Sequence, residues 1–128
     1  MGYRSEVEFY IEGESAAALW LKFVTKHQNN LSCNWFFENE ENYVKGDKTG
    51  IRFIKESNII HFYHSNIKWY DSYEDIQALI ALWAESAEFD NLCGEFVRLG
   101  EELEDVEIDS FGENEYKLQV YRTIESSI

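Results

Sequence analysis

The spacing of hydrophobic residues alternates along this chain between the period of a strand and the period of a helix. Residues 3–12 alternate between apolar and polar side chains, which is typical of a half-buried strand. Residues 14–24 then repeat apolar side chains at helical spacing. Two further strand-like runs follow, at residues 51–56 and 59–64. This order of periods constrains the fold more than any single motif does.

A second helical pattern covers residues 71–87, and Asp71 with Glu74 has the spacing of a capping box at its start. The remaining strand-like runs lie at residues 94–100, 106–109 and 116–122. The order therefore reads strand, helix, strand, strand, helix, strand, with further strands at the end. It predicts a single α+β domain over residues 1–128. The expected architecture is a ferredoxin-like βαββαβ antiparallel sheet with two helices on one face and a C-terminal strand extension.

Residues 29–49 fit neither period. An apolar triplet at residues 35–37 is surrounded by Asn and Glu, and residues 45–50 have the composition of a turn. We expect Glu38, Glu40 and Glu41 to lie in a loop or a weak helical turn.

The negative charge of the chain is concentrated in its second half. The formal net charge is −14, of which residues 1–64 carry −2 and residues 65–128 carry −12. This excess argues against direct nucleic-acid binding and against adhesion to an anionic membrane, because both need Lys and Arg. The N-terminus has no apolar core of a secretory signal, and the apolar runs are short. We therefore expect a cytoplasmic protein.

The acidic residues that follow the run at 94–100 form the candidate partner-binding ridge. They are Glu101, Glu102, Glu104, Asp105, Glu107, Asp109 and Glu113. On a strand, Asp105, Glu107 and Asp109 point to one side, so we expect Val106 and Ile108 on the other side to be buried. Such carboxylates lie about 6.5–7 Å apart, close to the spacing of successive phosphates in a nucleic-acid strand. The ridge either attracts a basic partner or is a solvated face that limits edge pairing.

Three aromatic residues, Trp69, Tyr70 and Tyr73, cluster before the second helix. They form either an anchor for a partner, since Trp and Tyr dominate binding hot spots, or a cover for the open end of the sheet.

The sequence indicates no catalytic or metal-binding constellation. His61 and His64 differ by three positions on a predicted strand, so they face opposite sides and cannot share a metal. Cys33 and Cys93 lie in no motif with a mechanism, and we expect them to be buried free thiols. The acidic residues do not follow the spacing of a calcium-binding loop. We expect a protein that is not an enzyme and has no cofactor and no metal site.

Three segments, MGYRSEV at residues 1–7, IKWYDSY at 67–73 and FVRLGEE at 96–102, resemble a family of small acidic proteins. These proteins, mostly uncharacterised, come from tailed bacteriophages and prophages. The resemblance does not extend to residues 29–49 and transfers no catalytic residue. It implies an accessory protein that acts in the cytoplasm of an infected bacterium and binds a host enzyme or blocks a defence system.

Together these observations predict a non-enzymatic protein that binds a host protein with a basic surface through the acidic ridge. In this hypothesis the ridge imitates a nucleic acid, and the chain contacts neither nucleic acid nor membrane directly. The alternative is a structural, self-assembling module without a charged interface. The sequence leaves open whether the protein is a monomer or a homodimer.

Overall fold

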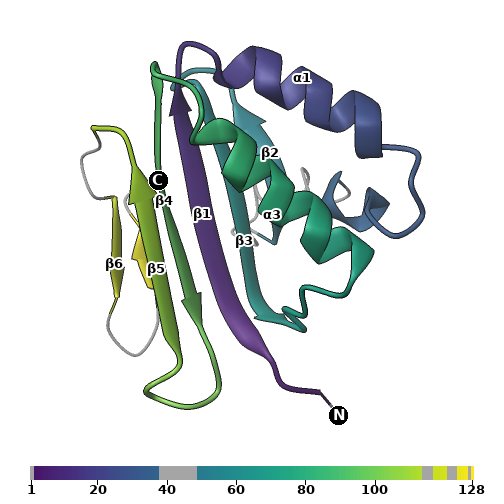
Figure 1. The fold of residues 1–128 in the computed structure, drawn as a ribbon, viewed down its shortest axis with the longest axis vertical. Helices are drawn as coiled ribbons and strands as arrows, with labels where there is room; N and C mark the ends of the chain where they lie inside the picture. Colours follow the sequence, from purple (N-terminus) through teal and green to yellow (C-terminus); the bar gives the residue numbers. More distant parts are fainter. Residues whose placement is uncertain (1, 38–48, 114–116, 121–123, 127) are drawn as a thin grey trace.

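The computed structural model describes residues 2–37, 49–113, 117–120, 124–126 and 128. It has an α+β architecture in which two helices pack on a five-stranded antiparallel sheet (Figure 1). Within the described residues, no helix is long and apolar enough to cross a membrane.

Five strands form the main sheet. They are β1 (Ser5–Gly13), β2 (Gly50–Ile54), β3 (Ile59–Ile67), β4 (Leu92–Leu99) and β5 (Val106–Phe111). Their order across the sheet is β2-β3-β1-β4-β5, and every neighbouring pair is antiparallel. The run predicted at residues 106–109 is thus an edge strand of the main sheet, beside β4. The sheet is therefore wider than the predicted βαββαβ arrangement.

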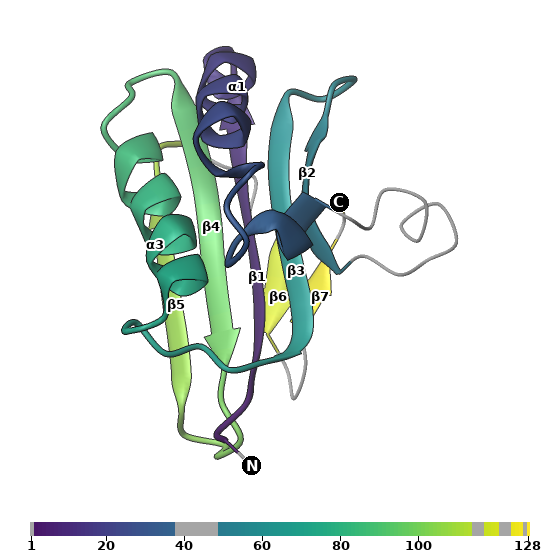
Figure 2. The ribbon, with the colours of Figure 1, turned by 90° about the vertical axis from the view of Figure 1, so that its right-hand side faces the viewer.

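Both helices cover the same face of the sheet, as Figure 2 shows. The apolar stripe predicted on α1 (Ala16–His27) has five members. Ala16, Leu19 and Phe23 are buried, whereas Trp20 and Val24 are half-buried. A short 3-10 helix, η1 (Asn34–Phe37), packs beside it, whereas Glu38, Glu40 and Glu41 lie outside the described residues.

The second helix, α3 (Glu74–Ser86), starts later than the sequence suggests. Its N-cap is Tyr73, and no side chain caps it, so the predicted capping box of Asp71 and Glu74 is wrong. Asp71 lies in the preceding turn, where its carbonyl oxygen accepts a hydrogen bond from Gln77 Nε2 at 3.1 Å.

The core between the sheet and the helices is centred on Phe9, which is fully buried. Its ring stacks on Phe62 of β3 at 5.3 Å and on Phe96 of β4 at 5.9 Å between ring centroids. Trp83 of α3 meets the Phe9 ring edge-on at 5.9 Å. The aromatic residues of three adjacent strands and one helix therefore form one continuous layer, which contributes large apolar burial.

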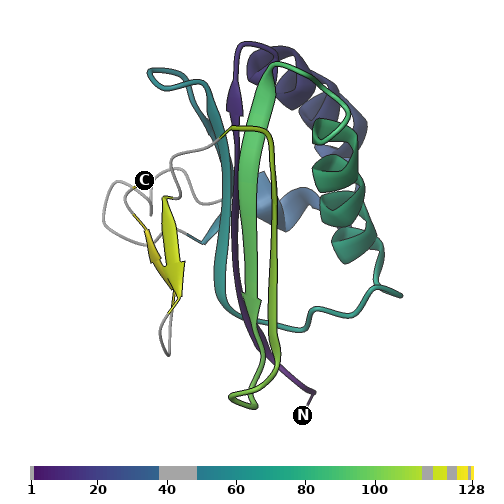
Figure 3. The ribbon, with the colours of Figure 1, turned by 60° about the vertical axis from the view of Figure 1, so that its left-hand side comes forward.

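A small hairpin of β6 (Leu118–Val120) and β7 (Ile124–Ser126) covers part of the opposite face, as Figure 3 shows. β6 confirms the strand predicted at residues 116–122 over Leu118–Val120, whereas residues 116, 121 and 122 lie outside the described residues. The sequence did not predict its partner β7. Leu118 and Ile124 pack in one apolar cluster with Tyr10 of β1 and Val97 of β4. The sheet is accordingly covered on both faces, by helices on one side and by the hairpin on the other.

Candidate functional site

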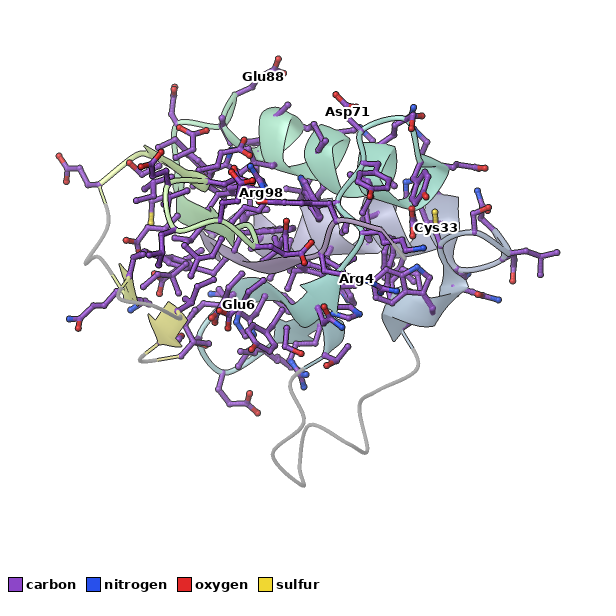
Figure 4. All side chains as sticks on the ribbon, turned by 90° about the horizontal axis from the view of Figure 1, so that it is seen from below. Arg4, Glu6, Cys33, Asp71, Glu88 and Arg98 are labelled. Atoms are coloured by element: carbon purple, nitrogen blue, oxygen red, sulfur yellow. The ribbon has the colours of Figure 1, made fainter. Side chains whose placement is uncertain are left out.

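The acidic residues of the second half lie mostly on α3 and β5 or in the turns beside these two elements, and α3 and β5 contact each other. Residues 69–113 contain fourteen acidic residues and a single basic residue, Arg98. Trp83 joins the two elements, because its Nε1 donates to Asp109 Oδ2 at 2.9 Å and its ring packs on Phe111 at 4.9 Å. Asp71 and Glu88, on the helix side, lie across the sheet from Glu6 (Figure 4).

We call the carboxylates on this side of the molecule the α3–β5 face. Its members are Asp71, Glu88, Glu101, Glu102, Glu104, Asp105, Glu107, Asp109 and Glu113.

Arg98 holds two members of the ridge in place. Its Nη2 lies 2.7 Å from Asp105 Oδ1, and its Nε lies 2.9 Å from Glu107 Oε1. The Tyr3 hydroxyl donates to Asp105 Oδ2 at 2.6 Å. The Arg98 guanidinium and the Tyr3 hydroxyl together lower the pKa of Asp105 to about 2. Asp105 and Glu107 therefore fasten the turn between β4 and β5 to the N-terminal segment.

The other ridge carboxylates differ in their hydrogen bonding and exposure. Glu101 Oε2 accepts a hydrogen bond from the Arg4 backbone N–H at 2.7 Å. Glu102 and Glu104 are exposed, and within the described residues their carboxylates have no hydrogen-bond or ion-pair partner. Glu113 is also exposed. Glu102 and Glu104 are consequently the ridge residues best placed to meet a partner.

The expectation that Val106 and Ile108 are buried is wrong. Val106 is 42% exposed and Ile108 is 65% exposed. The physical reason is the position of β5 at the edge of the sheet, where the C-terminal hairpin packs on Val97 and Leu99 of β4 instead. Strand alternation correctly placed the acidic and the apolar side chains of β5 on opposite sides of the strand. The apolar side, however, is not covered by the hairpin.

The aromatic cluster divides between core and surface. Trp69 lies in the core, 6.2 Å from Phe62 and 5.8 Å from Phe96 between ring centroids. The Tyr70 hydroxyl accepts a hydrogen bond from the Tyr3 backbone N–H at 2.7 Å. Tyr73 is 41% exposed. Trp69 and Tyr70 therefore close the lower end of the sheet, and only Tyr73 presents its ring to solvent.

A buried polar layer lies between the sheet and the C-terminal hairpin, and the sequence did not reveal it. His61 Nε2 lies 2.6 Å from Glu8 Oε2, and both side chains are almost completely buried. Among the described residues, the other ring nitrogen of His61, Nδ1, has no hydrogen-bond partner. The alternation of β1 suggested that Glu8 lies on the polar side of a half-buried strand, and nothing local to it signals the hairpin that covers that side.

Two more carboxylates of this layer bind the hairpin backbone. Glu95 Oε2 accepts hydrogen bonds from the backbone N–H groups of Lys117 at 2.6 Å and Leu118 at 3.2 Å. Glu6 Oε1 accepts one from Ile124 N–H at 3.3 Å. Burial raises the pKa of Tyr10, and the neighbouring Glu95 carboxylate raises it further. These acids hold the second layer on the sheet.

The residues considered for catalysis do not converge. His61 lies on the hairpin side, whereas His64 contacts Trp35 on the helix side, so the prediction of opposite sides is confirmed. Both cysteines are free thiols, with Cys33 buried and Cys93 half-buried. Burial raises the pKa of the Cys33 thiol, the direction opposite to that of an activated nucleophile. In the described part of the chain, no three His, Cys, Asp or Glu side chains could hold a metal ion together.

Comparison of the chain with protein-family models, with curated proteins and with solved structures gave no match. A proposal for its function therefore depends on the geometry and charge of its own residues.

Proposed function

We propose that this chain is a non-enzymatic binding protein that captures a partner protein with a basic surface through the α3–β5 face. The observation that carries the proposal is the charge of residues 69–113, where a single base stands among fourteen acids. That base, Arg98, is already paired with Asp105 and Glu107. A field of one sign over a surface accelerates association with a partner of opposite charge and fixes its orientation.

The way the ridge is held favours binding. Arg98, Tyr3 and Trp83 fix Asp105, Glu107 and Asp109, so these carboxylates lose little freedom when a partner docks. Glu102 and Glu104 extend from the same turn into solvent. A fixed row of carboxylates with exposed neighbours is the charge pattern that a nucleic-acid-binding surface would meet in its own ligand.

The setting of this function follows from the resemblance to small acidic bacteriophage proteins. We place the chain in the cytoplasm of an infected bacterium, where its partner is a host enzyme or defence protein that binds nucleic acid. In this proposal the chain itself contacts neither nucleic acid nor membrane.

We also propose that β1, α1, β2, β3, α3 and β4 form a ferredoxin-like unit, to which β5 and the hairpin are added. The order β2-β3-β1-β4 within the sheet and its antiparallel pairs support this assignment. In such a unit the added β5 extends the sheet beyond β4 and carries Glu107 and Asp109 of the acidic face.

The function is tested by capture from a bacterial lysate, with bound proteins identified by mass spectrometry at low and at high salt. The test variant carries Glu102→Lys and Glu104→Lys. The control carries Glu14→Lys and Glu56→Lys, two exposed acids outside the face, and changes the net charge by the same amount. We expect the test variant to recover the partner about tenfold less or worse, and the control to behave as the parent. Equal recovery by all three proteins would exclude the face as the interface.

A second candidate function, self-assembly, is favoured by the exposed apolar side of β5. Ile108 and Leu103 are 65% and 73% exposed, and the outer edge of β5 has no neighbouring strand in the described sheet. An edge strand of this kind can pair with a second copy. Light scattering discriminates the two functions. A dimer whose mass is insensitive to salt and which Ile108→Lys dissociates would support self-assembly, and a monomer at every salt concentration would exclude it.

A further inference from the structure

A shallow cavity of about 330 Å³ opens at the lower end of the molecule, where β3 ends and α3 begins. Side chains from the N-terminal segment, η1, β3 and α3 line it. Those that the argument uses are Arg4, Trp35, His64, Lys68, Tyr73 and Asp75. A volume of this size is at the lower end of the range for small-molecule sites.

The cavity gathers cations that have no acidic partner, in a chain with 25 acidic residues. The Arg4 guanidinium reaches only the carbonyl oxygen of Asn66, at 3.4 Å. Neither Arg4 nor Lys68 forms an ion pair with any carboxylate of the described residues. By contrast, Lys22 and Arg98 are paired with acids. Arg4 and Lys68 thus leave positive charge available at this cavity.

The acids nearest to the cavity are committed elsewhere. Asp75 Oδ2 accepts a hydrogen bond from Trp35 Nε1 at 3.0 Å, and its Oδ1 accepts one from the Ile76 backbone N–H at 2.9 Å. Glu74 Oε1 accepts a hydrogen bond from Asn30 Nδ2 at 2.6 Å. Asp75 therefore serves to fix the indole of Trp35 and the first turn of α3, and its oxygens do not cover the cations.

Aromatic groups supply the remaining wall. Trp35 packs edge-on against His64, with 5.7 Å between ring centroids. Tyr73 packs edge-on against Tyr70 at 5.1 Å and keeps 41% of its surface exposed. His64 Nδ1 accepts a hydrogen bond from the Asn66 backbone N–H at 3.0 Å, which helps to fix its ring in the wall of the cavity. The cavity therefore combines hydrogen-bond donors and positive charge with an exposed aromatic ring.

The geometry points to a binding site for a nucleotide, a class of ligand that the acidic face does not address. Its phosphate lies between Arg4 and Lys68, where both cations donate to oxygen. Its base lies on the aromatic wall, with Tyr73 as the exposed platform, since an aromatic ring gains by stacking with any base. The site borders the α3–β5 face at Glu101, whose carboxylate accepts a hydrogen bond from the Arg4 backbone N–H at 2.7 Å. The side chains of Arg4 and Lys68 form no ion pair with a ridge carboxylate within the described residues, so their charges remain available to a ligand.

Calorimetric titration of the full chain with ADP, and separately with inorganic phosphate, tests the proposal at low salt. We expect ADP to bind more tightly than phosphate. Lys68→Ala and Arg4→Ala should each weaken ADP binding about tenfold, because each removes one charge-assisted contact. Lys55→Ala, at an exposed lysine in the β2–β3 turn, changes the net charge equally and should leave the affinity unchanged.

A further variant separates the aromatic part of the site. Tyr73→Ala should weaken ADP binding and leave phosphate binding as it is. Three results would overturn the proposal: no heat with ADP at millimolar concentration, equal affinities for ADP and phosphate, or equal losses in the Lys68→Ala and Lys55→Ala proteins. Circular dichroism on each variant shows that the chain remains folded, so a loss of binding reports on the site.

Discussion

Glu8 and Glu95 face the C-terminal hairpin, whereas Glu102 and Glu104 face solvent, and the fold uses these two pairs of glutamates in opposite ways. Glu8 is 2% exposed and Glu95 is 6% exposed, and each has hydrogen-bond partners from a distant part of the chain. Glu102 and Glu104 are exposed, and their carboxylates have no partner within the described residues. The acidity of this chain therefore has two sources, one that holds its layers together and one that remains available to a ligand.

Buried and exposed carboxylates must therefore be considered separately before the net charge of a protein is assigned a function. A carboxylate that accepts two backbone hydrogen bonds in the interior stabilises the fold and repels little at the surface. A carboxylate in solvent adds little to stability but contributes to the field that a partner meets. Asp105 lies between these extremes, because it is at the surface and yet is held by Arg98 and Tyr3.

The largest effect on stability is expected at Glu8. Glu8→Ala leaves the buried Nε2 of His61 without its partner and should lower the free energy of unfolding by about 3 kcal/mol, the upper end of the range for a buried polar group left unsatisfied. Urea denaturation measures it. The double variant Glu8→Leu with His61→Leu should lose less than the single variant, because no unpaired polar group is left. A Glu8→Ala protein as stable as the parent would contradict the claim that Glu8 stabilises the fold through His61.

A smaller effect is expected at Glu95, whose carboxylate binds the hairpin backbone. Glu95→Ala should lower the free energy of unfolding by about 1.5–3 kcal/mol, the range for hydrogen bonds to a charged group. Amide hydrogen exchange should rise at Leu118 and Val120 and remain unchanged in the helical layer, for example at Leu79 of α3. Uniform loss of protection over both faces would contradict the assignment of Glu95 to the hairpin.

A still smaller effect, visible only in acid, is expected at Asp105. Its pKa in the folded protein is about 2, below the ordinary value of an aspartate, so its contribution to stability is present above about pH 4 and is lost as the pH falls towards 2. Asp105→Asn should therefore flatten the loss of stability in this window, and Glu104→Gln should leave the slope as in the parent. Thermal unfolding from pH 5 to pH 2 measures the slopes, and equal slopes in all three proteins would contradict the Asp105 assignment.

Local patterns predicted the elements well where the period is regular. The strand at β1 and the buried stripe of α1 follow from spacing alone, because each depends on neighbours within a few positions. The placement of both helices on one face followed from the order of strands and helices along the chain. The capping of α3 by Asp71 and the burial of Val106 and Ile108 did not follow. The first depends on where the preceding turn ends, and the second on which layer covers the edge of the sheet. A short stretch of sequence contains neither kind of information.

The sequence predicted where the acidic residues of the candidate site lie along the chain, but not which side chains they contact. The ridge at residues 101–113 was evident from charge, yet its pairing with Arg98 depends on the β4–β5 register, which sets Arg98 opposite Glu107. The contribution of α3 depends on Trp83, which lies 26 residues before Asp109. The Glu8–His61 pair spans 53 residues, and no spacing rule connects them. Long-range contacts thus decide which acids are free.

The most direct test of the account measures stability and binding on the same variant. Glu102→Lys with Glu104→Lys should leave the free energy of unfolding within about 0.5 kcal/mol of the parent, because exposed carboxylates without partners contribute little to stability. The same variant should lose the salt-sensitive partner that the parent and the Glu14→Lys, Glu56→Lys control recover from a bacterial lysate. A variant that folds as the parent does and still recovers the same partner would contradict the claim that the free acids of the α3–β5 face form the interface.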